Sequence, residues 1–300
     1  MFSPKILIVS GTHGNEINPI WAVNQFRQLK NNARISNLIF TLGNPEAISQ
    51  GLRYVDVDLN RSFHKDKINL NENSYEIRRA AQLVKQYGSK GLEPCQIVFD
   101  LHTTTASMGT SIVMYGRREK DFCLAAILQN KFGLPVYLHE NDSNQTGFLV
   151  ESWESGLVIE IGSVAQNFYD YKIIERFLII LDFISNLGET IQNRKINFPR
   201  EITLHIHQKS IDYPRDKDLN INALIHPQRT NKDWIKIKSG DPLFLDMNGK
   251  TIFYEEENEV YPVFIGEVAY REKNIAMSFT EKKTIKCSKE WIDNFLNFQS

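Results

Sequence analysis

The sequence predicts an α/β fold, in which a mixed, largely parallel sheet is covered by helices and is followed by a smaller β-rich C-terminal domain. Two patterns support this prediction. Before about residue 193, near-continuous apolar strand candidates alternate with helical segments, as they do in parallel sheets that are buried on both faces. Beyond about residue 200 the chain changes to short alternating or aromatic-rich runs separated by turn residues, which are typical of β structure.

Local patterns predict each element. The first strand is expected at 5–10, because its apolar, β-branched run is closed by Gly11, and a helix is expected after Pro19. The later strands are expected at 38–42, 96–101, 110–115, 135–138 and 157–161, and the later helices at 74–88, 121–132 and 171–187. The C-terminal runs are 202–206, 243–245, 251–254 and 260–264, so the chain divides into domains 1–197 and 198–300.

Composition excludes several classes of protein. The chain has 300 residues, 42% of them hydrophobic, and a net charge of -1 from 35 basic and 36 acidic side chains, which argues against a nucleic-acid partner. The N-terminus lacks the pattern of a secretory signal, and the longest apolar stretch, 177–184, is too short to cross a membrane. Three scattered cysteines, Cys95, Cys123 and Cys287, fit a reducing compartment, so we expect a cytoplasmic protein.

Polar side chains follow two of the predicted strands and resemble a metal site. His13 and Glu16 lie just past the first strand, and His102 ends the strand at 96–101. Open α/β sheets place their ligands at such strand ends, and two imidazoles with one carboxylate leave a zinc position open for water. Asp100, on the same strand face as His102, could orient an imidazole. Chance spacing in an ordinary loop remains an alternative.

Two further segments hold candidate residues. The run from Arg53 to Phe63 contains Asn60 and Arg61, and arginine suits both bidentate binding of a carboxylate and stabilisation of an oxyanion. A solvated loop in which the arginines pair with acidic neighbours is the alternative. Glu160 lies within an apolar strand, where a carboxylate is costly unless it has a partner or a role as a general base. It could instead end the strand and face solvent.

Together these segments resemble the aspartoacylase and succinylglutamate desuccinylase branch of the zinc carboxypeptidase-like fold. The motifs that carry the resemblance extend from the first strand nearly to the C-terminus: GTHGNE at 11–16, DLNR at 58–61, DLHTT at 100–104, IEIG at 159–162, DYPRD at 212–216, IHP at 225–227, GDP at 240–242 and VYPVF at 260–264. The later motifs favour aspartoacylases over carboxypeptidases. The resemblance therefore covers both expected domains.

The resemblance implies a role for each candidate residue. His13, Glu16 and His102 match the ligands of one zinc ion per chain, Glu160 matches the general base, and Arg53 matches the arginine that polarises the scissile carbonyl. Asn60 and Arg61 match the pair that binds the substrate carboxylate. Tyr270 matches a substrate-contacting tyrosine. Residues 1–197 would then form the zinc-hydrolase domain, and 198–300 would contribute to the substrate channel.

The expected activity is hydrolysis of an N-acyl amino acid, with N-acyl-L-aspartate as the first candidate substrate and a homo-oligomer as a possible assembly. Better-known aspartoacylases carry an arginine ten residues before the general base, where this chain has Val150. Strict selectivity for aspartate therefore requires another cation, for which Lys209 is the candidate. Deacylation of neutral N-acetyl or N-succinyl amino acids is the alternative, and a non-catalytic amino-acid-binding protein is a further one.

Overall fold

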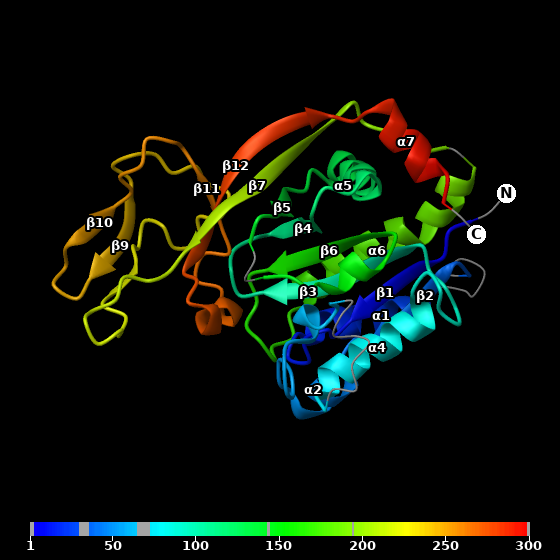
Figure 1. Cartoon of the computed structure of the whole chain (residues 1–300), viewed down its shortest axis with the longest axis horizontal. Helices are drawn as coiled ribbons and strands as arrows, with labels where there is room; N and C mark the ends of the chain where they lie inside the picture. The colour runs from blue at the N-terminus through cyan, green and yellow to red at the C-terminus, as the bar shows by residue number, and fades with distance from the viewer. Residues whose placement is uncertain (1–2, 30–35, 65–72, 143–144, 194, 299–300) are drawn as a thin grey trace.

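A nine-stranded sheet organises the computed structural model, which describes residues 3–29, 36–64, 73–142, 145–193 and 195–298. Its strands are β1 (Ile6–Ser10), β2 (Leu38–Leu42), β3 (Ile97–Thr104), β4 (Thr110–Tyr115), β5 (Val136–His139), β6 (Ser155–Gly162), β7 (Glu201–Ile211), β11 (Tyr261–Val263) and β12 (Met277–Lys286). Across the sheet they lie in the order β11-β12-β7-β5-β4-β6-β3-β1-β2 (Figure 1).

The sheet is mixed, and its central strands are mostly parallel. Strands β2, β1, β3 and β6 run parallel to one another, whereas β4 is antiparallel to β6. Strands β5 and β7 are parallel to β4, and the β7–β12–β11 edge is antiparallel. The predicted fold class is confirmed. Because β4 runs antiparallel to β6, the start of β4 lies beside the end of β6, and Ser111 pairs with Glu160.

Both faces of the sheet are buried by apolar side chains that alternate along each strand. On β1, Ile6 and Ile8 join a core with α1 (Ile17–Leu29), α5 (Glu119–Phe132), α6 (Tyr171–Gln192) and α7 (Lys289–Leu296). Leu7 and Val9 face the other core, formed with α4 (Tyr75–Tyr87), η1 (Leu59–Arg61) and η2 (Leu149–Ser152). This alternation explains why the strands read as continuous apolar runs.

Three helix boundaries differ from the sequence prediction. Helix α1 begins at Ile17 rather than at Pro19, α5 begins at Glu119 rather than at 121, and α6 continues to Gln192 instead of ending at 187. Ser74 precedes α4, as predicted, but its side chain makes no capping hydrogen bond. Such end effects depend on tertiary packing more than on local sequence.

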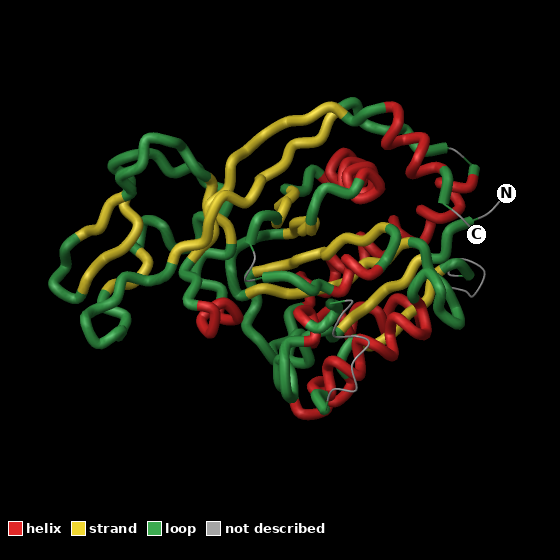
Figure 2. Tube along the Cα trace, in the orientation of Figure 1, coloured by secondary structure: helices red, strands yellow, loops and turns green. Residues whose placement is uncertain are grey.

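The C-terminal part extends from the main sheet. Strands β8 (Ala223–Ile225), β9 (Pro242–Asp246) and β10 (Thr251–Phe253) form a small antiparallel sheet, which lies at the far left of Figures 1 and 2 and has its own apolar core. Strands β7 and β12 connect this region to the main sheet and belong to it. Alternating polarity does not reveal which sheet a strand joins, so this continuity was not predicted. The division at 197 stays a prediction.

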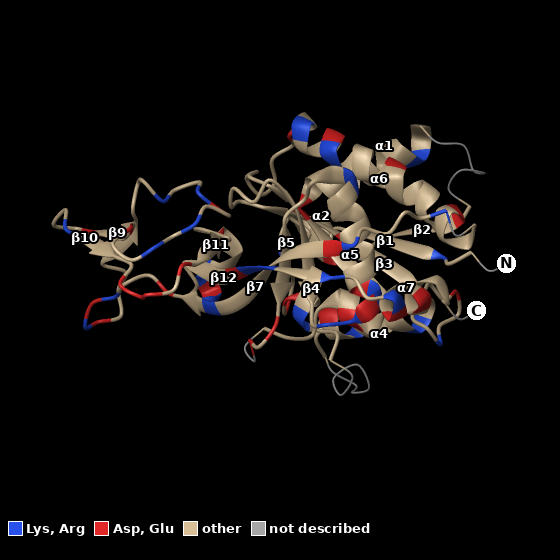
Figure 3. Cartoon of the chain, turned by 90° about the horizontal axis from the view of Figure 1, so that it is seen from above, with Lys and Arg blue, Asp and Glu red and all other residues tan. Residues whose placement is uncertain are grey.

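Charged residues are interspersed over the molecule. Both acidic and basic positions occur on the helices and on the C-terminal extension (Figure 3). No helix in the described part of the chain is long and apolar enough to cross a membrane.

Candidate metal centre and active site

The loop after β1 approaches α2 (Pro45–Gln50) so closely that it needs glycine. A Cβ added to Gly14 would lie 2.2 Å from the carbonyl carbon of Ala47, so any other residue would force the loop away from α2. The Gly14 amide donates to the carbonyl of Arg53 at 3.1 Å. The loop that carries His13 and Glu16 is therefore tied directly to the loop that carries Arg53.

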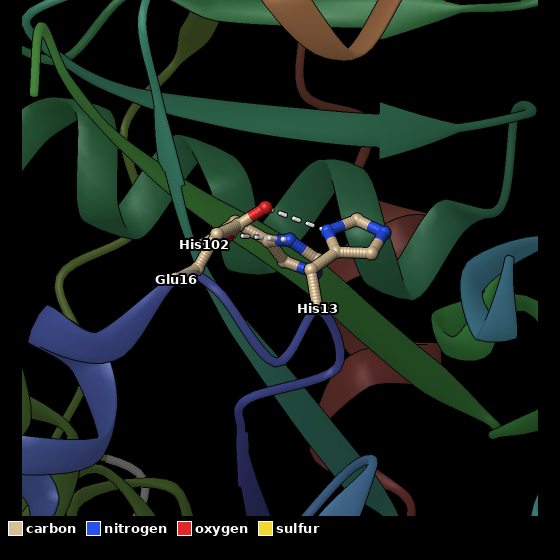
Figure 4. A group of neighbouring side chains, drawn as sticks. All are labelled: His13, Glu16 and His102. Carbon is tan, nitrogen blue, oxygen red and sulfur yellow. Dashed lines mark hydrogen bonds and ion pairs between the residues drawn. The ribbon is translucent and has the colours of Figure 1, made fainter. Parts of the chain in front are cut away.

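His13, Glu16 and His102 converge at the carboxyl ends of β1 and β3. In the parallel register Ser10 pairs with Leu101, which places His102 at the same edge as the loop after β1. Glu16 Oε1 lies 2.6 Å from His13 Nδ1, and Glu16 Oε2 lies 3.2 Å from His102 Nδ1 (Figure 4). The three side chains are buried, and their potential ligand atoms all lie within 4.8 Å of one another. No other such group occurs in the described residues.

The outer nitrogen of each imidazole contacts a carboxylate. His102 Nε2 lies 2.7 Å from Asp100 Oδ2, and His13 Nε2 lies 3.0 Å from Asp58 Oδ1. Ionised carboxylates only accept hydrogen bonds, so both Nε2 atoms donate and both Nδ1 atoms are left to face Glu16. Histidines that bind zinc are held in this way. The donor set therefore fits a divalent cation. The predicted contact of Asp100 is confirmed; that of Asp58 was missed.

The electrostatics of the group also suit a cation. Burial alone would raise the pKa of Glu16, but His13 and His102 oppose it and hold that pKa well below its usual range. Burial would lower the pKa of His102, whereas Asp100 and Glu16 raise it well above the ordinary histidine value. The surrounding carboxylates thus create a negative potential at the two Nδ1 atoms, where a divalent cation would be stabilised.

Glu160 faces the same cavity from β6. It pairs in register with His102, is 9% exposed and does not end its strand at the solvent. Burial raises the pKa of Glu160 well above its usual value, and Glu16 and Glu267 raise it further, against the opposing effect of His102. A buried carboxyl group with a raised pKa is a stronger base than an ordinary carboxylate and is a candidate for proton transfer.

Arg53 and Arg61 approach the cavity from the predicted arginine segment, which is partly buried: both arginines are half-buried, and Asp58 to Asn60 are buried. Arg53 Nη2 lies 3.1 Å from Asp58 Oδ2, and Nη1 lies 3.6 Å from Glu16 Oε1. The pairing of Arg53 with Asp58 expected for a surface loop is present, yet Asp58 is buried. Arg61 Nη1 donates to the carbonyl of Asn60 at 2.7 Å. Asn60 Oδ1 accepts from the amide of Leu149 at 2.8 Å.

Tyr270 reaches the cavity from η3 (Val268–Lys273), in the C-terminal part. Glu267, just before η3, holds this segment to the end of β3. Its carboxylate accepts hydrogen bonds from the Thr104 hydroxyl, from the amide of Thr105 at 2.8 Å and from the amide of Ala269 at 3.0 Å. No local sequence pattern pointed to Glu267, because Thr104 and Thr105 lie more than a hundred positions before it.

A single cavity brings together every residue predicted for the site. Its lining includes the predicted residues His13, Glu16, Arg53, Asn60, Arg61, His102, Glu160 and Tyr270. It also includes residues that were not predicted: Thr103, Thr104, Tyr115, Val158, Phe264, Glu267 and Ala269.

Two expectations about other residues have clear outcomes. Lys209 is wrong as a replacement cation, because it pairs with Glu256 on the surface and does not line the cavity. His205 and His207 alternate on β7, a spacing that could also suit a metal ion, but they contact Thr280 Oγ1 at 3.3 Å and the carbonyl of Glu140 at 3.0 Å and belong to no metal-type group among the described residues.

The fold and the cavity together define an α/β protein with a buried His–Glu–His group suited to a metal ion. A family profile described as the succinylglutamate desuccinylase/aspartoacylase catalytic domain matches residues 3–184, and one described as the AstE/AspA barrel-sandwich hybrid domain matches residues 200–282. The chain belongs to the succinylglutamate desuccinylase/aspartoacylase family, as its motifs predicted.

Individual relatives agree with this assignment. A protein of Prochlorococcus marinus subsp. pastoris, described as a probable aspartoacylase, is 60% identical over 98% of this chain and 99% of its own length. Murine aminoacylase 3 superposes with a TM-score of 0.85 at 27% identity, covering 96% of this chain and 98% of its own. The succinylglutamate desuccinylase of Chromobacterium violaceum shares the fold, with a TM-score of 0.63 at 19% identity over 94% and 85%.

Proposed function

We propose that this chain is a zinc-dependent amidohydrolase that removes the acyl group from N-acyl amino acids. The observation that carries the proposal is the meeting, in one cavity, of the His13–Glu16–His102 group with Glu160, Arg53 and Arg61. A protein that only binds an amino acid has no use for a buried carboxyl group beside a metal site. The non-catalytic alternative is therefore disfavoured.

His13, Glu16 and His102 would hold the zinc ion. Zinc bound by two histidines and one carboxylate supplies a Lewis acid and lowers the pKa of water from 15.7 to about 7. Asp58 and Asp100 would keep both imidazoles oriented through their Nε2 atoms.

Glu160 would act as the general base and then as the general acid. It accepts a proton from the attacking water and passes it to the nitrogen of the departing amine. Its raised pKa makes Glu160 a stronger base than an ordinary carboxylate, which favours removal of the proton from water. No residue of the chain has to form a covalent acyl intermediate.

Arg53 would stabilise the negative charge that develops on the scissile carbonyl oxygen. Its two carboxylate contacts, to Asp58 and Glu16, hold the guanidinium in place before the reaction, so little reorganisation is needed. Asn60 and Arg61 would bind the substrate's α-carboxylate, and Tyr270 would contact the substrate from the C-terminal part. Fixing the carboxylate sets the distance between the amide and Glu160.

N-acyl-L-aspartate is the substrate suggested by the relatives that are described as probable aspartoacylases. The proposal covers N-acyl amino acids as a class, because the reacting groups contact only the amide and the α-carboxylate. A cytoplasmic location and a homo-oligomeric assembly stay predictions; Cys95, Cys123 and Cys287 are free thiols, as a reducing compartment requires.

The test compares wild type with Glu160→Gln in zinc-loaded protein on a panel of N-acetyl, N-formyl and N-succinyl amino acids. The amide is nearly isosteric but cannot accept the proton, so we expect kcat to fall at least roughly a hundredfold with zinc content and Tm retained. Full activity in Glu160→Gln, or in protein shown by elemental analysis to hold no stoichiometric metal, would contradict the mechanism.

A further inference from the structure

Three side chains form a stack beside the α-carboxylate subsite. The Tyr115 ring lies on the Phe148 ring with centroids 3.6 Å apart and planes 22° from parallel. The Arg61 guanidinium carbon lies 4.1 Å from the same Phe148 centroid. The Tyr115 ring and the Arg61 guanidinium would overlap if both lay on the same face of Phe148. Phe148 therefore lies between Tyr115 and Arg61. We call this arrangement the Arg61–Phe148–Tyr115 stack.

The stack is held in place from behind. Phe148 is 3% exposed, and its amide donates to Glu151 Oε2 at 2.8 Å. Arg61 Nη2 donates to Gln145 Oε1 at 2.8 Å. His139 packs edge-on against both rings, with centroids 5.6 Å from Tyr115 and 5.5 Å from Phe148. Tyr115 therefore presents a fixed aromatic surface to the cavity that it lines.

The position of the stack relates it to one part of the substrate. The α-carbon of an amino acid carries both the carboxylate and the side chain. If Arg61 binds the carboxylate, as the proposed function requires, the side chain must lie within a few ångströms of Arg61. Tyr115 is the cavity-lining member of the stack that contains Arg61, and Val158 and Phe264 also line the cavity. Tyr115, Val158 and Phe264 thus offer the substrate side chain an aromatic and apolar surface.

In the part of the cavity lining that the structure describes, no arginine or lysine is left for a second carboxylate on the substrate. The arginines there are Arg53, which contacts two carboxylates, and Arg61, which is needed for the α-carboxylate. Glu160 and Glu267 add negative charge to the lining. A carboxylate buried without a partner is strongly unfavourable.

Val150 and His139, which lie behind the cavity lining, do not supply a positive charge for a second carboxylate either. Val150, at the position where better-known aspartoacylases have arginine, is fully buried in the apolar core with Leu149 and Trp153. Burial, with the neighbouring His207, lowers the pKa of His139 to about 4, so His139 is neutral at physiological pH.

We propose that Tyr115 is a specificity-determining residue and that the Arg61–Phe148–Tyr115 stack selects N-acyl amino acids with uncharged, apolar or aromatic side chains over N-acyl-aspartate. This proposal rests on the proposed function, which supplies the role of Arg61. Stacking against Tyr115 favours an aromatic side chain in particular, because offset aromatic pairs add attraction beyond the burial of area.

The first measurement is kcat/KM of the zinc-loaded wild-type enzyme for N-acetyl-L-phenylalanine, N-acetyl-L-leucine and N-acetyl-L-aspartate. We expect both apolar substrates to exceed the aspartate derivative by at least about tenfold. A preference for N-acetyl-L-aspartate of tenfold or more over both would overturn the proposal. Absence of hydrolysis for every N-acyl amino acid would instead refute the proposed function, so the two failures are distinguishable.

Substitutions of Tyr115 supply the second measurement. Tyr115→Arg places a cation in the cavity lining. It should raise the ratio of kcat/KM for N-acetyl-L-aspartate to that for N-acetyl-L-phenylalanine by about ten- to a hundredfold, the range expected for one charged hydrogen bond. Tyr115→Phe keeps the ring and should keep the wild-type ratio. Tyr169→Arg adds the same charge at a residue that is 61% exposed and does not line the cavity, and its ratio should also be unchanged.

An unchanged ratio in Tyr115→Arg, with the fold retained by circular dichroism and Tm, would show that Tyr115 does not face the side chain. If Tyr115→Arg fails to fold, competitive inhibition of the wild-type enzyme by L-phenylalanine and L-aspartate decides. We expect the apolar product to inhibit more strongly, and stronger inhibition by L-aspartate would overturn the proposal.

Discussion

Asp58 holds two functional side chains with one carboxylate. Its Oδ1 lies 3.0 Å from His13 Nε2 and accepts from the amide of Asn60 at 2.8 Å, while its Oδ2 accepts from Arg53. Burial would raise the pKa of Asp58, but His13 and Arg53 hold it well below its usual range, so the group stays ionised. The proposed metal ligand and the proposed oxyanion arginine therefore depend on the same residue.

Replacing Asp58 with asparagine should weaken both functions. We expect zinc affinity to fall by about ten- to a hundredfold, the usual cost of losing such a partner, and kcat to fall as well because Arg53 loses its ion pair. Competition with a chelator gives the affinity. Asp56→Asn is the matched control. Asp56 is exposed, and its side chain accepts a hydrogen bond from the amide of Tyr75 at the start of α4. Equal zinc affinity in the two variants would contradict the role of Asp58.

At this scale strand order predicted the residues at strand ends, whereas the residues of the arginine segment gained their roles only from the family resemblance, and the role of Asp58 was missed. His13, Glu16, His102 and Glu160 were predictable because parallel strands bring their carboxyl ends to one edge. The contact between Asp58 and His13 depends on a loop conformation that no periodicity encodes. Lys209 was misplaced because its strand register, opposite Phe279 on β12, directs it to Glu256 rather than to the cavity.

Among the elements, α4 determines the shape of the arginine loop through one buried residue. Glu76 is fully buried and accepts hydrogen bonds from three consecutive backbone amides, those of Val55, Asp56 and Val57, at 2.7, 3.0 and 3.2 Å. It also accepts from Asn44 Nδ2 at 3.0 Å. The helix thus fixes the loop between Arg53 and Asp58 although it contributes no residue to the cavity.

Glu76→Gln should loosen this loop. A glutamine retains one acceptor oxygen in place of two, so at least one buried donor loses its partner, which costs about 1–3 kcal/mol of stability. We expect a lower Tm and a reduced kcat/KM, because Arg53 and Asp58 shift with the loop. Glu175→Gln, on the exposed side of α6, is the control for loss of a helical carboxylate. A variant with wild-type Tm and kcat/KM would show that the loop holds its shape without Glu76.

The sequence did not identify this function of α4. An acidic residue in the first turn of a helix is favourable for the helix dipole alone, and the partners of Glu76 lie about twenty positions earlier. The antiparallel direction of β4 was equally hidden, because a short apolar run is compatible with either direction. The presence of α4 and β4 was predictable from local sequence. The residues that each of them contacts, and the direction of β4, were decided by tertiary packing.

For the whole molecule, the main sheet crosses the predicted domain division, and it buries a histidine near the crossing. His139 lies at the end of β5, between β4 and β7 in the sheet, with Nδ1 3.0 Å from the Tyr137 hydroxyl and its ring centroid 5.1 Å from that of His207. Burial and His207 lower its pKa from 6.5 to about 4. Protonation of His139 therefore opposes folding.

The sign of this effect predicts acid sensitivity. The folded-state pKa is below the unfolded one, so the stabilisation is fully present above about pH 6.5 and is lost as the pH falls towards 4. Between pH 7 and pH 5 the loss should approach about 2 kcal/mol. Urea denaturation gives the free energy of unfolding of wild type and His139→Gln at both pH values. Because the metal ligands titrate in both proteins, subtracting the loss in the variant from the loss in wild type leaves the contribution of His139. Equal losses in the two proteins would refute the assignment to His139.

The groups proposed for hydrolysis and those proposed to discriminate among substrates are carried by different parts of the sheet. The ligands and the base come from the ends of β1, β3 and β6, whereas Tyr115 ends β4 and Phe148 precedes η2. Mutation can therefore alter the stack while the reacting groups are inherited intact. Enzymes descended from one ancestor would then cleave the same bond yet differ in the amino acids that they release. Sequence similarity alone would not reveal the substrate preference of each enzyme.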